Sequence, residues 1–462
     1  MRTMRRGAPG WGVTALALAA YVGACGTSGE RSATDTARHD SAGGSVANAA
    51  RDPSCASDNG GITLPDGFCA GVFADTIGHA RHMAVAPNGD VFIALEYHAP
   101  SRGDTTKKAS MVQAAAVALR DANHDGRADT IVYIGKGVKG GTGIALADSF
   151  LYVDEQTKIV RYQLPRGALE PTGAAQTVIS GIPISGDHNA RNFVIDGQGN
   201  LFLNIGSATN SCQERNRTAK SPGVNPCTEL RTRAGIWRFD ARKTGQVFTP
   251  NARYATGIRN AEGLAIDPAT GQLWATMHGR DQLYDNWQPL FDAKYSAENP
   301  GEQLMQVSQG DDFGWPYCYY SFDAKKLVLA PEYGGDGKKT EQCDQKKQPA
   351  AVFPGHWAPM DLLFYTGSMF PDKYRRGVFI PFHGSWNRAP EPQAGYRVVF
   401  QPLDGGKASG DFETLANGFA GANPQPDAAP HRPVGVAQGP SGELYISDDA
   451  HGRVWRVVHS GK

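Results

Sequence analysis

The sequence predicts an all-β protein: a six-bladed β-propeller with long loops between its strands, preceded by a disordered N-terminal tether. Three observations support this prediction. A hairpin-like unit recurs along the chain, stretches with helical periodicity are nearly absent, and the 462 residues include 56 Gly and 29 Pro. That composition suits many short strands joined by tight turns. We expect a lipoprotein signal peptide at residues 1–24, a flexible linker at 25–54 and the propeller at 55–462.

The repeated unit consists of a short apolar strand, a turn rich in Pro, Gly or Asp, and a second strand centred on an aromatic residue. Five copies are clear, and a sixth at residues 362–365 and 378–380 is looser. The central aromatic residues are Phe92, Tyr152, Phe202, Trp274, Phe379 and Tyr445. Copies along the whole chain favour a propeller over two separate β-sandwiches. The longest interval between copies holds residues 318–343, which we interpret as a single insertion.

The N-terminal residues indicate export. Three arginines lie among residues 2–6, and residues 12–24 form an apolar run that is too short to span a bilayer. The run ends at Val-Gly-Ala-Cys25, which resembles a bacterial lipobox with Cys25 as the lipidated residue; an ordinary cleaved signal peptide is the alternative. Gly26 favours the outer membrane, by resemblance to Gram-negative lipoproteins. We therefore expect the periplasmic side of the outer membrane or the cell surface, with the lipid anchor as the only membrane contact.

The remaining six cysteines agree with export, because an oxidising compartment permits disulfides. They fall into three pairs that are close in sequence, and proximity favours the pairings Cys55–Cys69, Cys212–Cys227 and Cys318–Cys343, although other pairings stay open. A metal cluster is disfavoured, since the chain has no CxxC spacing.

Charge and loop placement bear on the ligand. The chain has 46 Lys and Arg against 46 Asp and Glu, which excludes binding of nucleic acid by bulk charge. A short polar loop precedes the first strand of each unit, at residues 81–82, 139–142, 187–192, 257–260, 355–357 and 431–432. Equivalent positions of all blades face one end of a propeller, so we expect these loops to form a ligand site at the channel mouth. The alternative is that each His or Arg only caps a turn.

A separate loop has oxygen-bearing side chains at alternate positions, as Ca²⁺ requires. Its candidate ligands are Asp121, Asn123, Asp125 and Asp129, with Gly126 at the turn. It is not an EF-hand, because Val132 stands at the position of the bidentate Glu and a strand-like segment follows. A hairpin loop stabilised by Ca²⁺ and a solvated Asx-rich turn both remain open.

Five stretches together resemble the soluble glucose and L-sorbosone dehydrogenases that use pyrroloquinoline quinone (PQQ), a family of six-bladed propellers. They are GIRNAEGLAI at 257–266, HGRD at 278–281, GDDFGWP at 310–316, APMDLLFY at 358–365 and FHGSWNR at 382–388. The resemblance covers roughly residues 65–460. It implies an oxidoreductase that binds PQQ and Ca²⁺ and oxidises an aldose sugar or a sugar-derived aldehyde, with a soluble or membrane electron acceptor.

The same resemblance implies roles for individual residues. His188, preceded by Asp187, matches the general base, and Arg259 with Asn260 matches the pair that contacts the quinone. The backbone carbonyls of Gly279 and Arg280 match those that hold Ca²⁺, and Arg432 and Asp449 match cofactor contacts of the last blade. A cofactor-contacting Lys of the family is not visible in the fifth blade, and Pro430 replaces a second Arg. Arg388 or Arg280 would have to compensate.

Two other functions compete with a sugar dehydrogenase. One is a non-catalytic propeller that binds a sugar or a protein, and the other is a metal-dependent propeller of the lactonase type. The His- and Arg-rich loops argue against a lactonase, which needs carboxylates and Asn facing a central metal. The chain contains no GxSxG, HExxH or Walker A motif.

Overall fold

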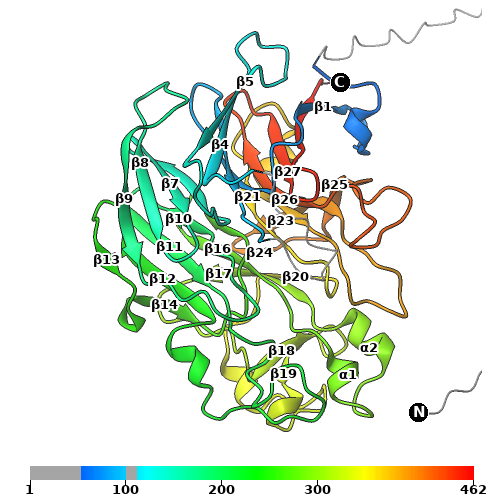
Figure 1. Cartoon of the computed structure of the whole chain (residues 1–462). Coiled ribbons are helices and arrows are strands. Elements are labelled where there is room, and N and C mark those ends of the chain that lie inside the picture. The colour runs from blue at the N-terminus through cyan, green and yellow to red at the C-terminus, as the bar shows by residue number, and fades with distance from the viewer. Residues whose placement is uncertain (1–53, 100–111, 462) are drawn as a thin grey trace, which may run out of the picture. The chain divides into compact units, whose positions relative to one another are not determined.

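The computed structural model describes residues 54–99 and 112–461 (Figure 1). The predicted signal peptide, Cys25 and nearly all of the predicted linker lie outside these residues. The described residues belong to one compact unit that is dominated by strands. Its α-helices are the short α1 (Leu283–Asn286) and α2 (Ala293–Glu298). In the part of the chain that the structure describes, no helix is long and apolar enough to cross a membrane.

Six sheets confirm the predicted six-bladed propeller. We number the blades in chain order. Blade 1 contains β2 (Ala80–Val85), β3 (Val91–Leu95), β4 (Ala116–Arg120) and β5 (Thr130–Ile134), and blade 2 contains β6 (Ile144–Ala147), β7 (Phe150–Asp154), β8 (Ile159–Gln163) and β9 (Thr172–Ser180), extended by β13 (Gln246–Val247). Blade 3 contains β10 (Phe193–Ile195), β11 (Asn200–Ile205), β12 (Gly235–Asp240) and β14 (Arg253–Thr256), and blade 4 contains β15 (Leu264–Ile266), β16 (Leu273–Met277), β17 (Glu302–Val307) and β20 (Ala351–Phe353).

Blades 5 and 6 complete the ring. Blade 5 contains β21 (Leu363–Phe364), β22 (Gly377–Phe382), β23 (Arg397–Asp404), β24 (Lys407–Ala408) and β25 (Glu413–Ala416), and blade 6 contains β26 (Pro433–Gln438), β27 (Leu444–Asp448), β28 (Val454–His459) and β1 (Phe68–Ala74). The first strand, β1, pairs antiparallel with the last, β28, with Phe68 opposite His459. Both ends of the propeller sequence therefore share one sheet, which closes the ring. The repeat pattern did not predict this pairing.

The central aromatic residue of each unit explains how neighbouring blades pack. Phe92, Tyr152, Phe202, Trp274, Phe379 and Tyr445 all lie on the second strand of their blades and are buried. Each one belongs to a hydrophobic cluster that it shares with the following blade; Trp274, for example, packs with Leu362 and Val378. Truncating such a side chain typically costs about 3–5 kcal/mol, so these positions hold the blades together.

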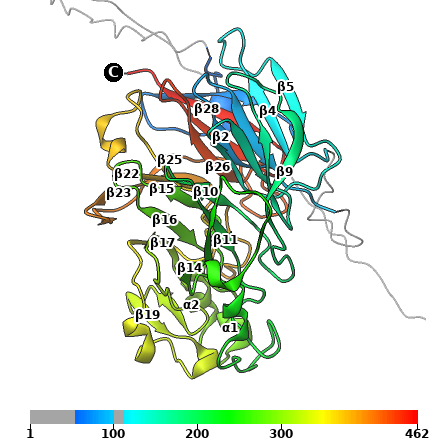
Figure 2. The same ribbon diagram turned by 90° about the vertical axis from the view of Figure 1, so that its left-hand side faces the viewer.

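The predicted insertion forms a separate hairpin, β18 (Cys318–Ser321) and β19 (Lys326–Leu329). Figure 2 shows β19, α1 and α2 gathered outside the six sheets, and their side chains share one hydrophobic cluster. Short 3₁₀ helices occupy other connections, at η1 (Asn59–Gly61), η2 (Thr228–Arg231), η3 (Pro250–Ala252), η4 (Pro331–Tyr333), η5 (Glu341–Gln345) and η6 (Asp372–Arg375).

The three predicted disulfides are confirmed. Their Cα atoms are 5.8 Å apart in Cys55–Cys69, 6.2 Å in Cys212–Cys227 and 5.8 Å in Cys318–Cys343, within the range that a disulfide spans. The first ties the chain before the propeller to β1. The third closes the insertion hairpin onto η5.

Candidate functional site

A cavity of about 580 Å³ occupies one end of the central channel. Every blade contributes to its wall, and the charged or aromatic residues there include Arg81, Glu96, His188, Glu262, His278, His383, Trp386 and Arg432. Five of the six predicted polar loops supply lining residues: those at 81–82, 139–142, 187–192, 257–260 and 431–432. The loop at 355–357 does not: His356 is buried and its Nε2 bonds the carbonyl of Ser296 at 2.7 Å.

His188 lines this cavity in the loop before β10. Its Nδ1 lies 3.0 Å from the carbonyl oxygen of Ser207 and 2.9 Å from Ser207 Oγ. A carbonyl only accepts, and Ser207 Oγ itself donates to the carbonyl of Thr209, so His188 Nδ1 must be the protonated nitrogen. The lone pair therefore resides on Nε2. Burial and the charge of Arg259 lower the pKa of His188 well below its usual value, which keeps the ring neutral at pH 7.

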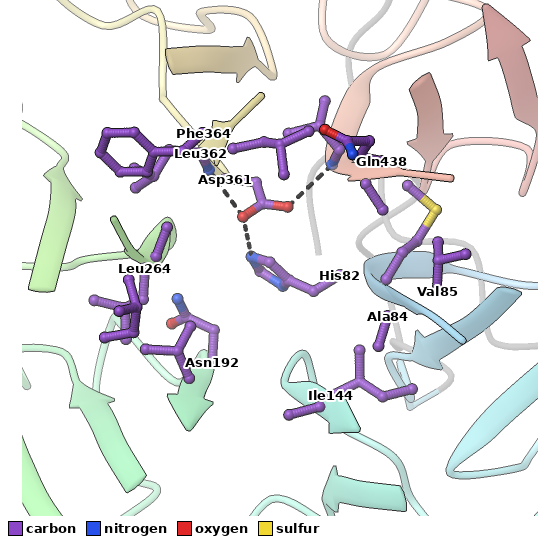
Figure 3. A pocket seen from close by; sticks show the side chains of 18 of the residues that line it. His82, Ala84, Val85, Ile144, Asn192, Leu264, Asp361, Leu362, Phe364 and Gln438 are labelled. Carbon is purple, nitrogen blue, oxygen red and sulfur yellow. Dashed lines mark hydrogen bonds and ion pairs between the residues drawn. The ribbon is translucent and has the colours of Figure 1, made fainter. Parts of the chain in front are cut away.

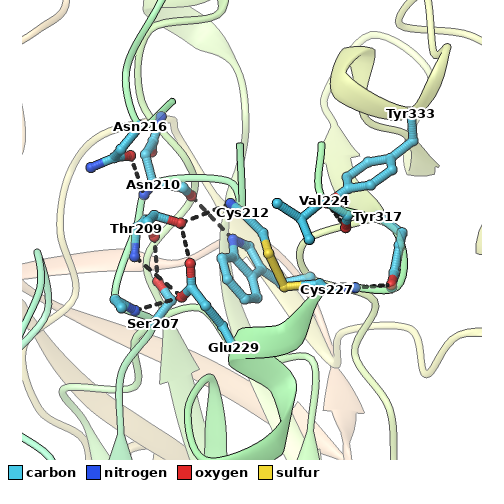
Figure 4. The surroundings of a disulfide bond; sticks show 12 residues. Ser207, Thr209, Asn210, Cys212, Asn216, Val224, Cys227, Glu229, Tyr317 and Tyr333 are labelled. Carbon is cyan, nitrogen blue, oxygen red and sulfur yellow. Dashed lines mark hydrogen bonds between the residues drawn. A yellow bond between two sulfur atoms is a disulfide. The ribbon is translucent and has the colours of Figure 1, made fainter. Parts of the chain in front are cut away.

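The loop that orients His188 is itself anchored. Glu229 accepts hydrogen bonds from the backbone N–H groups of Ala208 and Thr209 at 2.6 and 3.2 Å. Figure 4 shows these bonds beside the Cys212–Cys227 disulfide, which closes the far end of the same loop. Ser207 was not among the predicted site residues. It follows β11, and only the fold places it beside the His188 ring.

Asp187 also lines the cavity, but it does not orient the catalytic candidate. Its carboxylate accepts from Arg217 Nε at 2.9 Å and from Asn216 Nδ2 at 3.2 Å, whereas the His188 ring is held by Ser207. The predicted pairing of Asp187 with His188 in catalysis thus lacks support in the contacts of either side chain.

Arg259 and Asn260 point in different directions although they are adjacent. Asn260 lines the cavity and donates to Glu262 Oε1 at 3.1 Å. Arg259 is buried, with Nε on the carbonyl of Asn210 at 3.0 Å and Nη2 on Asp281 Oδ2 at 3.0 Å. Arg259 therefore acts on His188 through its charge.

A charged cluster forms the opposite wall. Asp449 bonds His383 Nε2 at 2.8 Å and Arg81 Nη1 at 2.8 Å. Burial by itself raises the pKa of a carboxyl, but the charge and hydrogen bond of His383 and the charge of Arg81 outweigh it and hold the pKa of Asp449 well below its usual value. Arg81 also pairs with Glu262 at 3.1 Å. The contacts of Asp449 are thus with the cavity-lining side chains Arg81 and His383, and its role as a cofactor contact stays a prediction. The resemblance did not assign a role to Arg81.

Two further lining residues present unused groups to a ligand. Arg432 donates through Nε to the carbonyl of His383 at 3.1 Å and through Nη2 to that of Gly384 at 2.8 Å. Its Nη1 has no hydrogen-bond partner among residues 54–99 and 112–461. The side chain of Trp386 is 55% exposed, which is unusual for an indole. Trp386 lies in the FHGSWNR motif, and its exposure is visible only in the folded structure.

Three other predicted cofactor or metal residues lie elsewhere. Arg280 Nη1 bonds Glu332 at 2.6 Å in a buried ion pair, and Arg388 bonds Glu298 at 2.7 Å and the carbonyl of Ala297 at 2.7 Å. Every guanidinium nitrogen of Arg388 bonds a protein oxygen, whereas the buried Nη2 of Arg280 has no hydrogen-bond partner within residues 54–99 and 112–461. Whether either residue replaces the missing Lys and Arg contacts stays a prediction. Gly279 borders a small neighbouring pocket that also includes Arg259, and its N–H donates to Glu302 at 2.9 Å.

The loop at residues 121–129 joins β4 to β5 in blade 1, away from the cavity. Asp121 accepts from the backbone N–H groups of Asp125 and Gly126, and Asp129 accepts from those of Ala122 and Asn123. These bonds are those of an Asx-rich turn. Ca²⁺ binding by Asp121, Asn123, Asp125 and Asp129 stays a prediction.

These features define a class: a six-bladed propeller with one polar, histidine-lined cavity at the channel mouth. The TrAA12-like family matches residues 62–460, and the chain belongs to that family. The family resemblance inferred from the motifs is thereby confirmed.

Curated relatives include PQQ-dependent sugar dehydrogenases. The chain is 26% identical over 240 residues to a pyrroloquinoline quinone-dependent pyranose dehydrogenase of Coprinopsis cinerea, covering 44% of this chain and 30% of that protein. It is 22% identical over 287 residues to an aldose sugar dehydrogenase of Escherichia coli, covering 59% and 60%. An uncharacterised protein of Borreliella burgdorferi is 25% identical over 207 residues, covering 44% and 48%. The chain therefore spans 30% to 60% of the length of these relatives.

Solved structures share the fold. The calcium structure of the Trichoderma reesei Family AA12 enzyme superposes with a TM-score of 0.69 at 17% identity, covering 87% of this chain and 97% of that one. The holo form of the pyranose dehydrogenase PQQ domain from Coprinopsis cinerea superposes with a TM-score of 0.66 at 18% identity, covering 86% and 97%.

Proposed function

We propose that this protein is a PQQ-dependent dehydrogenase that oxidises a pyranose or other aldose sugar, or a sugar-derived aldehyde, in the cavity at the channel mouth. The observation that carries this proposal is His188. Its Nδ1–H is committed to Ser207, so Nε2 holds a lone pair beside the cavity. A neutral imidazole so placed is a general base that removes a proton from a sugar hydroxyl.

The cavity fits PQQ in volume and in chemistry. About 580 Å³ is within the usual range for a cofactor site. PQQ is flat and carries three carboxylates; Arg432, with a free Nη1, offers a charge-assisted donor, and the exposed ring of Trp386 offers a face for stacking. Asn260 and His278 supply further polar contacts. When bound, PQQ supplies the acceptor for the hydride that leaves the sugar.

We propose Ca²⁺ as the second cofactor. The resemblance assigns it to the carbonyls of Gly279 and Arg280. Support comes from Glu302, a buried carboxylate 2.9 Å from the Gly279 N–H. Burial raises the pKa of Glu302 to about 7, and a divalent cation at this segment would stabilise its ionised form.

Charged residues of the chain keep the base neutral and fix the opposite wall of the cavity. Burial and the charge of Arg259, which Asp281 holds in place, together keep the His188 ring neutral, so that the base is ready at pH 7. The Asp449–His383 and Asp449–Arg81 bonds hold the opposite wall rigid, which limits the positions that a bound sugar can adopt.

We also propose that the mature protein is exported and anchored by a lipid on Cys25. The motif Val-Gly-Ala-Cys25 and the three disulfides support this location.

The test is reconstitution with PQQ and Ca²⁺, followed by dye reduction with a panel of aldoses. His188→Gln should lower kcat by roughly 10²–10⁴-fold while PQQ binding changes little. Asp187→Asn, in the adjacent residue, is the matched control and should change kcat by less than about tenfold, because its partner is Arg217. Dye reduction unchanged in His188→Gln would refute the assignment. Sugar binding without dye reduction in the unmutated protein would favour the non-catalytic binding propeller.

A further inference from the structure

His82 lies near the middle of the central channel, at the third position of β2. The polar cavity lies on one side of it, and a second cavity of about 420 Å³ lies further along the same first strands. Figure 3 shows His82 directed into the channel, with Asp361 facing it and apolar side chains such as Leu264 and Ile144 around them. His82 and Asp361 are both buried.

Both ring nitrogens of His82 face hydrogen-bond acceptors. Nδ1 lies 2.9 Å from the carbonyl oxygen of Thr142. Nε2 lies 2.9 Å from the carbonyl oxygen of Glu262 and 2.9 Å from that of Met360. A backbone carbonyl oxygen never donates, and a neutral imidazole has one N–H only. In a neutral ring, one nitrogen lone pair would therefore face a carbonyl lone pair at 2.9 Å, which is an unfavourable contact for a buried side chain.

The charges around His82 accommodate a cation. Asp361 Oδ1 lies 3.9 Å from Nε2 and provides the nearest negative charge. Glu262 pairs with Arg81 on the cavity side. Asp154 accepts from the backbone N–H of Thr142 at 3.0 Å; burial raises the pKa of Asp154 to about 7, and the charge of Arg191 opposes that rise. Burial raises the pKa of Asp361 to about 6, and the neighbouring His82 opposes that rise.

We propose that His82 carries a proton on both ring nitrogens at neutral pH and that this imidazolium is a positioning residue for the cavity. It binds the loops that precede the first strands of blades 2, 4 and 5 at once, through three carbonyl oxygens. The same carbonyl of Glu262 also accepts from Asn192 Nδ2. Through its carboxylate, Glu262 then holds Arg81 and Asn260, which line the cavity. The part that concerns PQQ rests on the proposed function.

The protonation state is tested directly by NMR on the full-length protein labelled with ¹⁵N-histidine, without cofactor. At pH 7.5 His82 should show two protonated ring nitrogens. His188 and His278 are internal controls, since each has one nitrogen on a carbonyl, and each should show one protonated and one unprotonated nitrogen. An unprotonated nitrogen on His82 at pH 7.5 would overturn the proposal. This measurement is independent of whether the protein uses PQQ.

Two variants complete the test. Asp361→Asn removes the counter-charge, so His82 should lose its second proton at a lower pH than in the unmutated protein. The His82 signals are assigned by their absence in His82→Gln or, if that variant does not fold, by their displacement in Asp361→Asn. No displacement in Asp361→Asn would contradict the ion pair.

The positioning role is tested by PQQ affinity. His82→Gln should weaken PQQ binding by roughly 10–100-fold, as substitutions that misorient ligand-contacting groups typically do. At saturating PQQ, its kcat should fall less than that of His188→Gln. His451→Gln, at an exposed position of blade 6, is the control and should leave both values unchanged. Unchanged PQQ affinity in His82→Gln would refute the positioning role, whereas absence of PQQ binding in the unmutated protein would refute the proposed function and leave the NMR result standing.

Discussion

Gly206 allows His188 and Asn260 to share one side of the cavity, and adding a single methyl group there should separate them. Gly206 follows β11, and a Cβ built on it would lie 2.6 Å from the Cβ of His188 and 2.8 Å from Asn260 Oδ1. To restore an ordinary carbon–carbon contact of about 3.5 Å, the His188 Cβ must move by roughly 0.9 Å. The His188 ring would then leave its hydrogen bonds to Ser207.

We therefore expect Gly206→Ala to lower kcat by about 10²-fold, which is the usual effect of a misplacement of about 1 Å in a catalytic group. Its free energy of unfolding should fall by about 1–3 kcal/mol, the typical cost of overpacking. The assay is dye reduction by the reconstituted enzyme, with urea unfolding measured alongside.

Gly197→Ala is the matched control. Gly197 lies in the turn between β10 and β11 of the same blade, and a Cβ there would meet nothing within 4 Å. This variant should have unchanged kcat. The displacement of His188 predicts a fall in kcat of about 10²-fold. If kcat of Gly206→Ala stays within about twofold of the unmutated value, the argued geometry of His188 is wrong.

Three further predictions follow from single features. Glu332→Ala should lower the free energy of unfolding by about 3–5 kcal/mol, because Arg280 is left as a buried unpaired charge; urea titration measures it. The pKa of His188 is lowered, and protonation removes its Nε2 lone pair. We therefore expect kcat/KM to stay level as the pH falls from 8 to about 6.5, which is the usual pKa of His, and to decline only below that pH. Cys25→Ser should abolish labelling of the protein by radioactive palmitate and release it from the membrane fraction.

Each of these has a contrary result. Glu413→Ala removes an exposed ion pair with Lys373 and should cost no more than about 1 kcal/mol; an equal loss in both variants would refute the role of burial. An acid limb of kcat/KM centred above pH 7 would contradict a lowered His188 pKa. An unmutated protein that is unlabelled and soluble would contradict lipidation.

Periodicity made much of the fold predictable. The six hairpin units, their central aromatic residues and the insertion follow from local sequence, because turn chemistry and strand alternation act over a few residues. The disulfides were also predictable from the sequence, since close sequence spacing and export favour local pairing. By contrast, the pairing of β1 with β28 joins segments at opposite ends of the propeller, and no local pattern encodes it.

The sequence by itself determined that polar loops open the repeated units and that His188 and Asn260 lie in them. Only the tertiary structure decided which neighbouring side chains share the cavity. Arg259 turns away to Asp281, and Arg280 is taken by Glu332. Successive residues in a loop point in different directions, and a buried charge goes to whichever opposite charge the fold brings within reach. Those partners come from distant parts of the chain, so the residues that orient the site, such as Ser207 beneath His188, emerge only when the blades have assembled.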